Sequence, residues 1–186
     1  MTEKENTMSK VLLVVAHPDL SQSKANAALV DAVRALPHVT VHDLYATYPD
    51  FKIDVDAEQA LLAEHDVIVF QHPVFWYNTT PLLKQWQDLV LTLGWAFTVD
   101  GSASQLAGKK AIVAVTAGVP EEHYTPEGQN GTTLEALLSN WGATLRLCQF
   151  DIQPMVPVYG TAFGLSDEDL ALAGKNYHEL LASYAA

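Results

Sequence analysis

The chain has little cysteine and few basic residues. Cys148 is the only cysteine among its 186 residues, which excludes an intramolecular disulfide and any multi-cysteine metal or iron–sulfur site. Ten Lys and Arg residues stand against 22 Asp and Glu residues, a formal charge of -12. This acidic excess argues against DNA, RNA or an anionic lipid surface as the main partner, so we expect no nucleic-acid partner.

The chain also lacks a hydrophobic run long enough for a targeting signal or a membrane span. The apolar stretch at residues 11–16 is broken at once by His17 and Pro18, and is too short for either role. The residues before it are polar and mixed in charge. We therefore predict a cytoplasmic protein with a disordered extension over residues 1–9 and a single domain over residues 10–186.

Several motifs of common enzyme classes are missing. Neither G-x-G-x-x-G nor G-x-x-x-x-G-K-[ST] occurs, so the sequence does not indicate a dinucleotide-binding Rossmann fingerprint or a P-loop. No G-x-S-x-G elbow of a serine hydrolase is present. The seven histidines show no H-E-x-x-H spacing, and we predict no metal site. We expect His72 and Cys148 to be buried structural residues.

What the chain does contain is an alternation of apolar runs and helical patterns. Runs at residues 11–16, 39–44, 67–70 and 111–115 are typical of strands buried on both faces. Helical patterns cover residues 25–36, 56–64, 82–93 and 132–140, with a last helix ending near residue 183. A fifth strand lies either at residues 143–150 or at 155–158. This order predicts a doubly wound α/β sheet with helices on both faces.

Three chemically unusual segments follow the first, third and fourth predicted strands. In such sheets, ligands bind outside the carboxyl ends of the strands, so these segments should meet at one edge. After the first strand, hydroxyls and Lys24 surround the start of a helix, where free N–H groups favour an anion. After the third strand, Phe75, Trp76 and Tyr77 suit a flat ligand. Together these features indicate a flavin nucleotide.

The same segments resemble a known family. A-H-P with downstream S-K-A-N, Q-H-P-V-F-W-Y with P-L-L-K-Q-W, and T-A-G after the fourth strand resemble the flavodoxin-like NAD(P)H:quinone oxidoreductases from about residue 10 to residue 183. The stretch VTVHDLYATYPDFKIDVDAEQALL is similar to the ancillary proteins of the glutathione-regulated potassium-efflux systems. The resemblance implies a flavodoxin-like five-stranded parallel sheet of order 2-1-3-4-5, bound FMN or FAD, NAD(P)H as co-substrate, and a homodimer.

The resemblance also implies which residues form the site. The cofactor-binding residues would be His17, Ser23, Lys24, Ala25, Asn26, Val74, Phe75, Trp76, Tyr77, Thr116, Ala117, Gly118 and Val119. Tyr124 and His123 would be the catalytic residues, donating hydrogen bonds to the flavin edge that becomes negative on reduction. Trp95 and Phe97 would line a substrate pocket that the partner subunit helps to close. One departure is Val119-Pro120, where the family often has glycines and where Pro120 offers no N–H.

Two functions follow as expectations. The first is hydride transfer from NAD(P)H through bound flavin to a quinone-like acceptor that enters the same site. The alternative is a redox-sensing ancillary subunit of a glutathione-regulated potassium-efflux antiporter, with little or no activity, held at the inner membrane through that protein partner. A flavodoxin-type one-electron carrier is disfavoured, because the chain has AHPDLSQSKAN where flavodoxins have a T-x-T-G-x-T loop.

Overall fold

The structure, a computed structural model, describes residues 8–163 and 165–185. The expected disordered extension falls mainly on residues 1–7, which lie outside the described residues. Among the described residues, the Ser9 N–H donates to the Tyr184 carbonyl oxygen (3.2 Å), so the start of the described chain lies against its end. No described helix combines the length and the apolar character needed to cross a bilayer.

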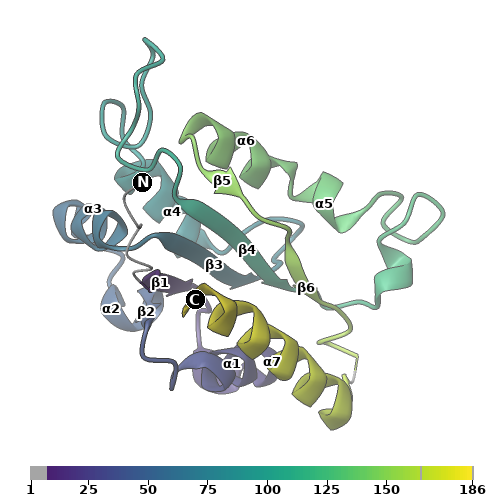
Figure 1. The fold of residues 1–186 in the computed structure, drawn as a ribbon. Helices are drawn as coiled ribbons and strands as arrows, with labels where there is room; N and C mark the ends of the chain where they lie inside the picture. Colours follow the sequence, from purple (N-terminus) through teal and green to yellow (C-terminus); the bar gives the residue numbers. More distant parts are fainter. Residues whose placement is uncertain (1–7, 164, 186) are drawn as a thin grey trace, which may run out of the picture.

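A parallel sheet forms the middle layer of the molecule (Figure 1). Its strands are β1 (Val11–Val15), β2 (Val39–Asp43), β3 (Val67–Pro73), β4 (Lys110–Thr116), β5 (Asp151–Ile152) and β6 (Val156–Val158). The order is β2-β1-β3-β4-β5, and β6 also pairs with β4. The predicted order 2-1-3-4-5 is therefore confirmed, with the fifth position filled by two short strands. Residues 153–155, with Pro154 at their centre, separate the two.

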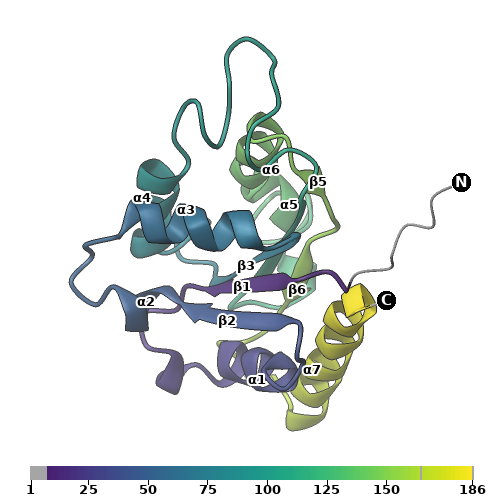
Figure 2. The same ribbon diagram turned by 60° about the vertical axis from the view of Figure 1, so that its left-hand side comes forward.

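Helices cover both faces of this sheet (Figure 2). They are α1 (Lys24–Val33), α2 (Leu44–Thr47), α3 (Val55–Glu64), α4 (Pro81–Val90), α5 (Leu134–Leu137), α6 (Ser139–Leu147) and α7 (Asp167–Ala182), with short 3-10 helices η1 (Leu20–Gln22), η2 (Glu121–His123) and η3 (Ser183–Ala185). Side chains of α1 and α7 pack on one face, and those of α3, α4 and α6 pack on the other. All five residues of β1 are buried, which explains its continuous apolar run.

The structure corrects two of the predicted elements. Residues 143–150 do not form the fifth strand, because most of them lie in α6. The buried residues Leu138, Trp141, Leu145 and Cys148 recur every three or four positions, which is the spacing of one helix face. The helix predicted over residues 132–140 is in fact the short α5 followed by α6. Cys148 is a buried core residue as expected, and burial raises the pKa of its thiol to about 11.

Strand β3 is longer than its apolar run suggests, because it continues through Gln71 and His72. Both side chains are fully buried. The His72 Nδ1 hydrogen-bonds the Pro73 carbonyl oxygen (2.9 Å), and its Nε2 accepts from the Trp141 indole N–H (3.1 Å). Burial lowers the pKa of His72 to about 4, so the ring is neutral. The prediction of a structural histidine is confirmed.

A buried carboxylate holds the segment after β2 to the rest of the domain. Glu58 of α3 accepts hydrogen bonds from His42 Nε2 (2.7 Å), the Tyr48 hydroxyl (2.6 Å) and the Trp86 indole N–H (2.7 Å). Burial alone would raise the pKa of Glu58, but the hydrogen bonds from His42 and Tyr48 outweigh it and the pKa lies below its ordinary value. This carboxylate therefore joins β2, α2, α3 and α4 on one side of the sheet.

Candidate functional site

A cleft of about 410 Å³ opens at the carboxyl edge of the sheet. The chain passes from β1 to β2 on one side and returns to β3 on the other, so the strand order reverses beside β1. The cleft is lined by His17, Gln22, Ser23, Lys24, Ala25, Asn26, Pro73, Val74, Phe75, Thr116, Gly118, Thr161 and Ala162. The three segments predicted from the sequence thus meet in one place. No acidic side chain belongs to this lining, although the chain has 22 of them.

The start of α1 gives the cleft its anion-binding end. Ser23 is the N-cap residue, and its Oγ accepts from the Asn26 N–H (3.1 Å). Within the described chain, no protein acceptor takes the backbone N–H groups of Lys24 and Ala25. These two donors therefore remain available to a ligand at the positive end of the helix.

His17 lies at the same end of the cleft as a neutral donor. Its Nδ1 accepts a hydrogen bond from the Asp19 backbone N–H (3.1 Å), which leaves the ring proton on Nε2. Burial lowers the pKa of His17, although the hydrogen bond from Asp19 acts in the opposite direction. The ring packs edge-on against Phe75, with centroids 6.5 Å apart. The Nε2–H is thus free to donate to a bound anion.

Lys24 lines the cleft as expected, but its ammonium group pairs with a residue of another helix. Its Nζ pairs with the Asp167 carboxylate at the start of α7, at 2.5 Å, and both side chains are exposed. An exposed ion pair of this kind is weak and screened by salt. Lys24 therefore lines the rim of the cleft while its charge is shared with a residue 143 positions away.

The aromatic residues after β3 form a tight reverse turn. The Phe75 N–H donates to the Asn78 carbonyl oxygen (2.9 Å), and the Asn78 N–H donates back to Phe75 (3.0 Å). The two central residues, Trp76 and Tyr77, have φ of 47° and 62°, in the left-handed region that bulky side chains avoid. Trp76 is 93% exposed, and the prediction of exposed aromatics at this edge is confirmed.

The segment after β4 runs beside the loop that follows β6. The Ala117 N–H donates to the Val158 carbonyl oxygen (2.8 Å), and Gly160 and Ala162 donate to Val119 and Gly118. A Cβ at position 118 would lie 3.3 Å from the Ala162 Cβ, which explains a glycine at this close approach. In the described chain, no protein acceptor takes the N–H groups of Gly118 and Val119. Two backbone donors therefore remain beside the cleft.

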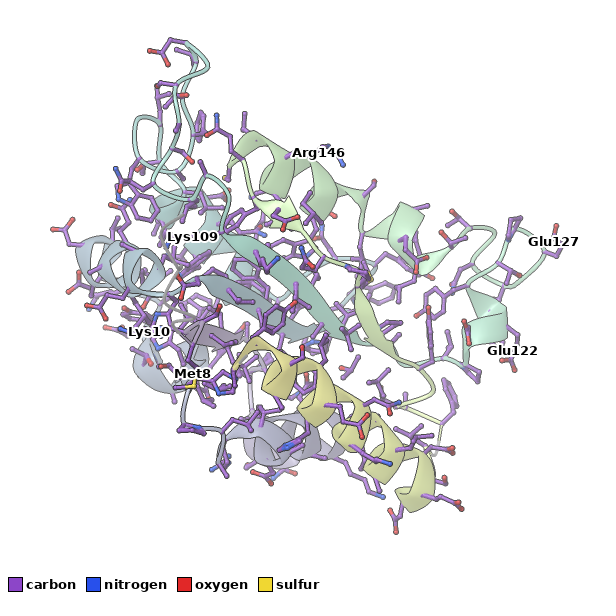
Figure 3. The ribbon with its side chains drawn as sticks, viewed as in Figure 1. Met8, Lys10, Lys109, Glu122, Glu127 and Arg146 are labelled. Atoms are coloured by element: carbon purple, nitrogen blue, oxygen red, sulfur yellow. The ribbon has the colours of Figure 1, made fainter. Side chains whose placement is uncertain are left out.

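Tyr124 and His123 follow this segment, at and just after η2, and are not part of the cleft lining. Tyr124 is buried against Tyr159, with ring centroids 5.6 Å apart, and its hydroxyl makes no hydrogen bond within the described residues. Burial raises the pKa of Tyr124, so its hydroxyl stays protonated and can donate. The His123 Nδ1 hydrogen-bonds the Gln129 side-chain oxygen (3.1 Å) in an exposed loop. Figure 3 places Glu122 and Glu127 at the outer end of that loop, far from Lys109.

Trp95 and Phe97 belong to the segment that joins α4 to the amino end of β4, at the opposite edge of the sheet from the cleft. They follow the end of α4, and the Trp95 carbonyl oxygen accepts from the Gln105 N–H (2.9 Å) in the loop that leads into β4 (Figure 1). Both are half-buried, and Phe97 lies beside the exposed residues Leu93 and Leu147. Neither residue lines the cleft.

Sequence reasoning missed part of the cleft lining. The missed residues are Gln22, Pro73, Thr161 and Ala162. Thr161 and Ala162 follow β6, for which the sequence offers two candidate segments, so the sequence does not single out the loop after it as a ligand segment. The signal that could have found them is Gly160, a glycine shortly after a short apolar run, which the structure places at a positive φ.

The comparisons with known proteins agree with this geometry. A family model described as a flavodoxin-like fold matches residues 9–181. The chain belongs to the flavodoxin-like NAD(P)H:quinone oxidoreductase family.

Two relatives and one solved structure of this family are similar to the chain over almost its whole length. The glutathione-regulated potassium-efflux system ancillary protein KefG of Cronobacter sakazakii is 45% identical over 94% of this chain and 93% of its own. The Bacillus subtilis protein named "uncharacterized NAD(P)H oxidoreductase YrkL" is 39% identical over 94% of this chain and 97% of its own. The crystal structure of general stress protein 14 from Treponema denticola in complex with FMN has a TM-score of 0.86 and 37% identity, covering 94% and 99%.

Proposed function

We propose that this protein is a flavin-dependent NAD(P)H:quinone oxidoreductase that binds FMN in the cleft at the carboxyl edge of its sheet. The observation that carries the proposal is a cleft rich in free donors and without acidic side chains, in a chain of charge -12. The T. denticola structure, which contains FMN on a similar fold, supports the choice of cofactor. FAD is the alternative cofactor.

The anionic end of FMN fits the start of α1. Free N–H groups of Lys24 and Ala25, the Ser23 hydroxyl and the His17 Nε2–H offer donors to a phosphate without needing a cluster of basic residues. Such local donors explain how a strongly acidic protein could hold a doubly negative group. Asn26 lies in the same segment, and its side chain is used within the protein.

The aromatic end of FMN fits between the segments after β3 and β4. Val74, Phe75 and the turn at Trp76 and Tyr77 would flank the ring on one side, and residues 117–119 would line its other edge. The Thr116 hydroxyl accepts from Asn26 and would face the anionic end. Bound FMN would supply a redox centre that takes a hydride from NAD(P)H and passes it to a quinone-like acceptor. The free N–H groups of Gly118 and Val119 would stabilise negative charge at the ring edge.

Tyr124 and His123 are the proposed catalytic donors. Burial raises the pKa of Tyr124, so its hydroxyl would remain a hydrogen-bond donor while charge builds on the ligand. Neither residue lines the cleft, so this role needs a ligand that extends to them or a loop at residues 119–131 that moves closer on binding. Replacing Tyr124 with Phe should lower kcat more than the affinity for FMN.

The substrate pocket is proposed to be completed by a second copy of the chain. Trp95 and Phe97 do not line the cleft of their own protomer, but the exposed apolar residues Leu93 and Leu147 suit a homodimer contact. Analytical ultracentrifugation tests the dimer. Replacing Leu93 with Lys should then give monomers that bind FMN but have lost quinone reductase activity.

An absorbance titration with FMN and FAD, followed by a steady-state assay with NADH or NADPH and a quinone, tests the main proposal. We expect a flavin spectrum that shifts on binding, and ping-pong kinetics from two substrates that use one site in turn. Absence of flavin binding under all conditions would refute the proposal. Kinetics that require a ternary complex would refute the shared site.

A second candidate function is that of an ancillary subunit of a potassium-efflux antiporter, located at the inner membrane through that partner. Its support is the 45% identity to KefG over 94% of the chain. Co-purification with such an antiporter, and potassium efflux that falls when this protein is deleted, would support it. Restoring efflux with a variant that binds FMN but does not reduce quinones would separate the regulatory role from the catalytic one.

A further inference from the structure

Gln71 is a fully buried polar side chain on β3 that lies behind the cleft and is not part of its lining. Its Nε2 donates to the Asn26 backbone carbonyl oxygen (3.0 Å) and to the Asn26 side-chain oxygen Oδ1 (3.3 Å). Its own oxygen, Oε1, is buried and has no hydrogen-bond partner in the described structure. A buried acceptor without a partner weakens a fold, so stability alone does not explain this glutamine.

The direction of the Gln71 amide is determined by its neighbour. A backbone carbonyl oxygen can only accept, so the group of Gln71 that lies 3.0 Å from it must be the NH₂. The second proton of this NH₂ points to the Asn26 side chain, whose facing atom must then be its oxygen. The NH₂ of Asn26 therefore faces the opposite way, toward Ser23 and Thr116.

The orientation of the Asn26 amide in turn determines the hydrogen bonds of two hydroxyls in the cleft lining. Its Nδ2 donates to Ser23 Oγ (3.1 Å) and to Thr116 Oγ1 (2.9 Å), and its backbone N–H also donates to Ser23 Oγ (3.1 Å). A hydroxyl has two acceptor positions and one proton. Ser23 has used both acceptor positions, so it can only donate further, and no acceptor of the described chain takes its proton. Thr116 has used one acceptor position, and among the described residues no acceptor takes its proton either.

We propose that Gln71 is a positioning residue for the flavin phosphate: acting through Asn26, it directs the Ser23 and Thr116 hydroxyls to donate into the cleft. The proposal rests on the function proposed above, because it needs FMN as the ligand. Together with the free N–H groups of Lys24 and Ala25, these hydroxyl donors favour a fully ionised phosphate monoester, whose outer oxygens all accept hydrogen bonds. Neither amide side chain needs to touch the ligand.

Replacing Gln71 with Glu tests this role, because it keeps the shape but removes the NH₂. A carboxylate would repel the Asn26 Oδ1, and the Asn26 amide would rotate so that its NH₂ meets Glu. Oδ1 would then face the two hydroxyls and accept their protons, which would no longer reach the phosphate. Loss of such charge-assisted donors should weaken FMN binding roughly ten- to hundredfold.

The readout is the ratio of the Kd values for FMN and riboflavin, measured by flavin fluorescence. Riboflavin lacks the phosphate, so its Kd should change far less in Q71E than the Kd for FMN. Gln87→Glu is the matched control, since Gln87 is a buried glutamine of α4 outside the cleft lining, and it should leave the ratio unchanged. In a Ser23→Ala background, Q71E should have a smaller effect on the ratio, because one of the two directed hydroxyls is gone.

Each outcome decides one question. A wild-type protein that binds FMN no better than riboflavin refutes phosphate recognition, and with it the proposed function. A wild-type protein that prefers FMN, with an equal preference in Q71E, overturns the role of Gln71 alone. If circular dichroism shows that Q71E is unfolded, Gln71→Met replaces it: an unchanged ratio there overturns the proposal, and a lowered ratio supports it.

Discussion

Substitutions at Trp76 can show whether the backbone of the aromatic turn is strained and whether the exposed ring contributes to ligand binding. Its φ of 47° lies in the left-handed region, where a side chain costs about 1–2 kcal/mol relative to the right-handed one. The side chain is 93% exposed, so the fold gains almost no apolar burial from it. A residue that strains the backbone without stabilising the core is expected where it serves binding.

Two substitutions separate the strain from the ring. Trp76→Ala removes the ring and keeps Cβ, whereas Trp76→Gly removes both. Glycine relieves the 1–2 kcal/mol of strain but gives the unfolded chain about 0.5–1 kcal/mol more freedom. The glycine variant should therefore be more stable than the alanine variant by about 0.5–1 kcal/mol. In a domain of this size that difference raises Tm by about 1–4 °C.

Calorimetry and FMN titration of both variants provide the assay. Both lose the same ring, so we expect FMN binding to weaken equally, by about two- to tenfold from the loss of aromatic packing. Equal Tm values for the two variants would show that the turn is not strained. Unchanged FMN affinity in both would show that the exposed ring has no part in binding the flavin.

Three further predictions concern other parts of the molecule. His17→Phe should weaken FMN binding but not riboflavin binding. Because burial keeps the pKa of His17 low, titration of His17 should not change the FMN affinity of the wild-type protein between pH 7 and pH 8. Glu58→Gln should destabilise the fold by roughly 2–3 kcal/mol in urea melts, since its hydrogen bonds involve a charge. The lowered Glu58 pKa means that its stabilisation is present above the unfolded-state pKa and is lost as the pH falls through the folded value, so the variant should show a weaker acid dependence of unfolding. Gly128→Ala should destabilise the loop after β4 by about 1–3 kcal/mol, because the new Cβ would lie 2.5 Å from the Glu122 carbonyl oxygen; a Tm equal to that of the wild type would contradict this.

The elements with strong local patterns could be predicted from the sequence. The run at residues 11–16 is apolar because both faces of β1 are covered, and Pro81 and Ser166 mark helix starts that the structure contains. The segments after three strands were recognised because hydroxyls and aromatics follow buried strands. The strand order came from the family resemblance.

The sequence pattern led to a wrong prediction where an apolar segment suits both a strand and a helix. Residues 143–150 are apolar enough for a strand, but the buried positions repeat with helical spacing and the segment is α6. Gln71 and His72 interrupt the apolar run of β3, yet they are buried within it because Asn26 and Trp141 supply hydrogen-bond partners from other elements. No local signal contains those partners.

The sequence by itself determined the composition of the site: a helix start with hydroxyls, a run of aromatics and a T-A-G segment, each placed after a strand. Only the tertiary structure decided how these groups are used. It pairs Lys24 with Asp167, commits the Asn26 amide to Ser23 and Thr116, and leaves Trp95 and Phe97 outside the cleft lining. The physical reason is that hydrogen bonds and ion pairs depend on atoms brought within about 3 Å by folding. Separation along the chain carries no information about that distance.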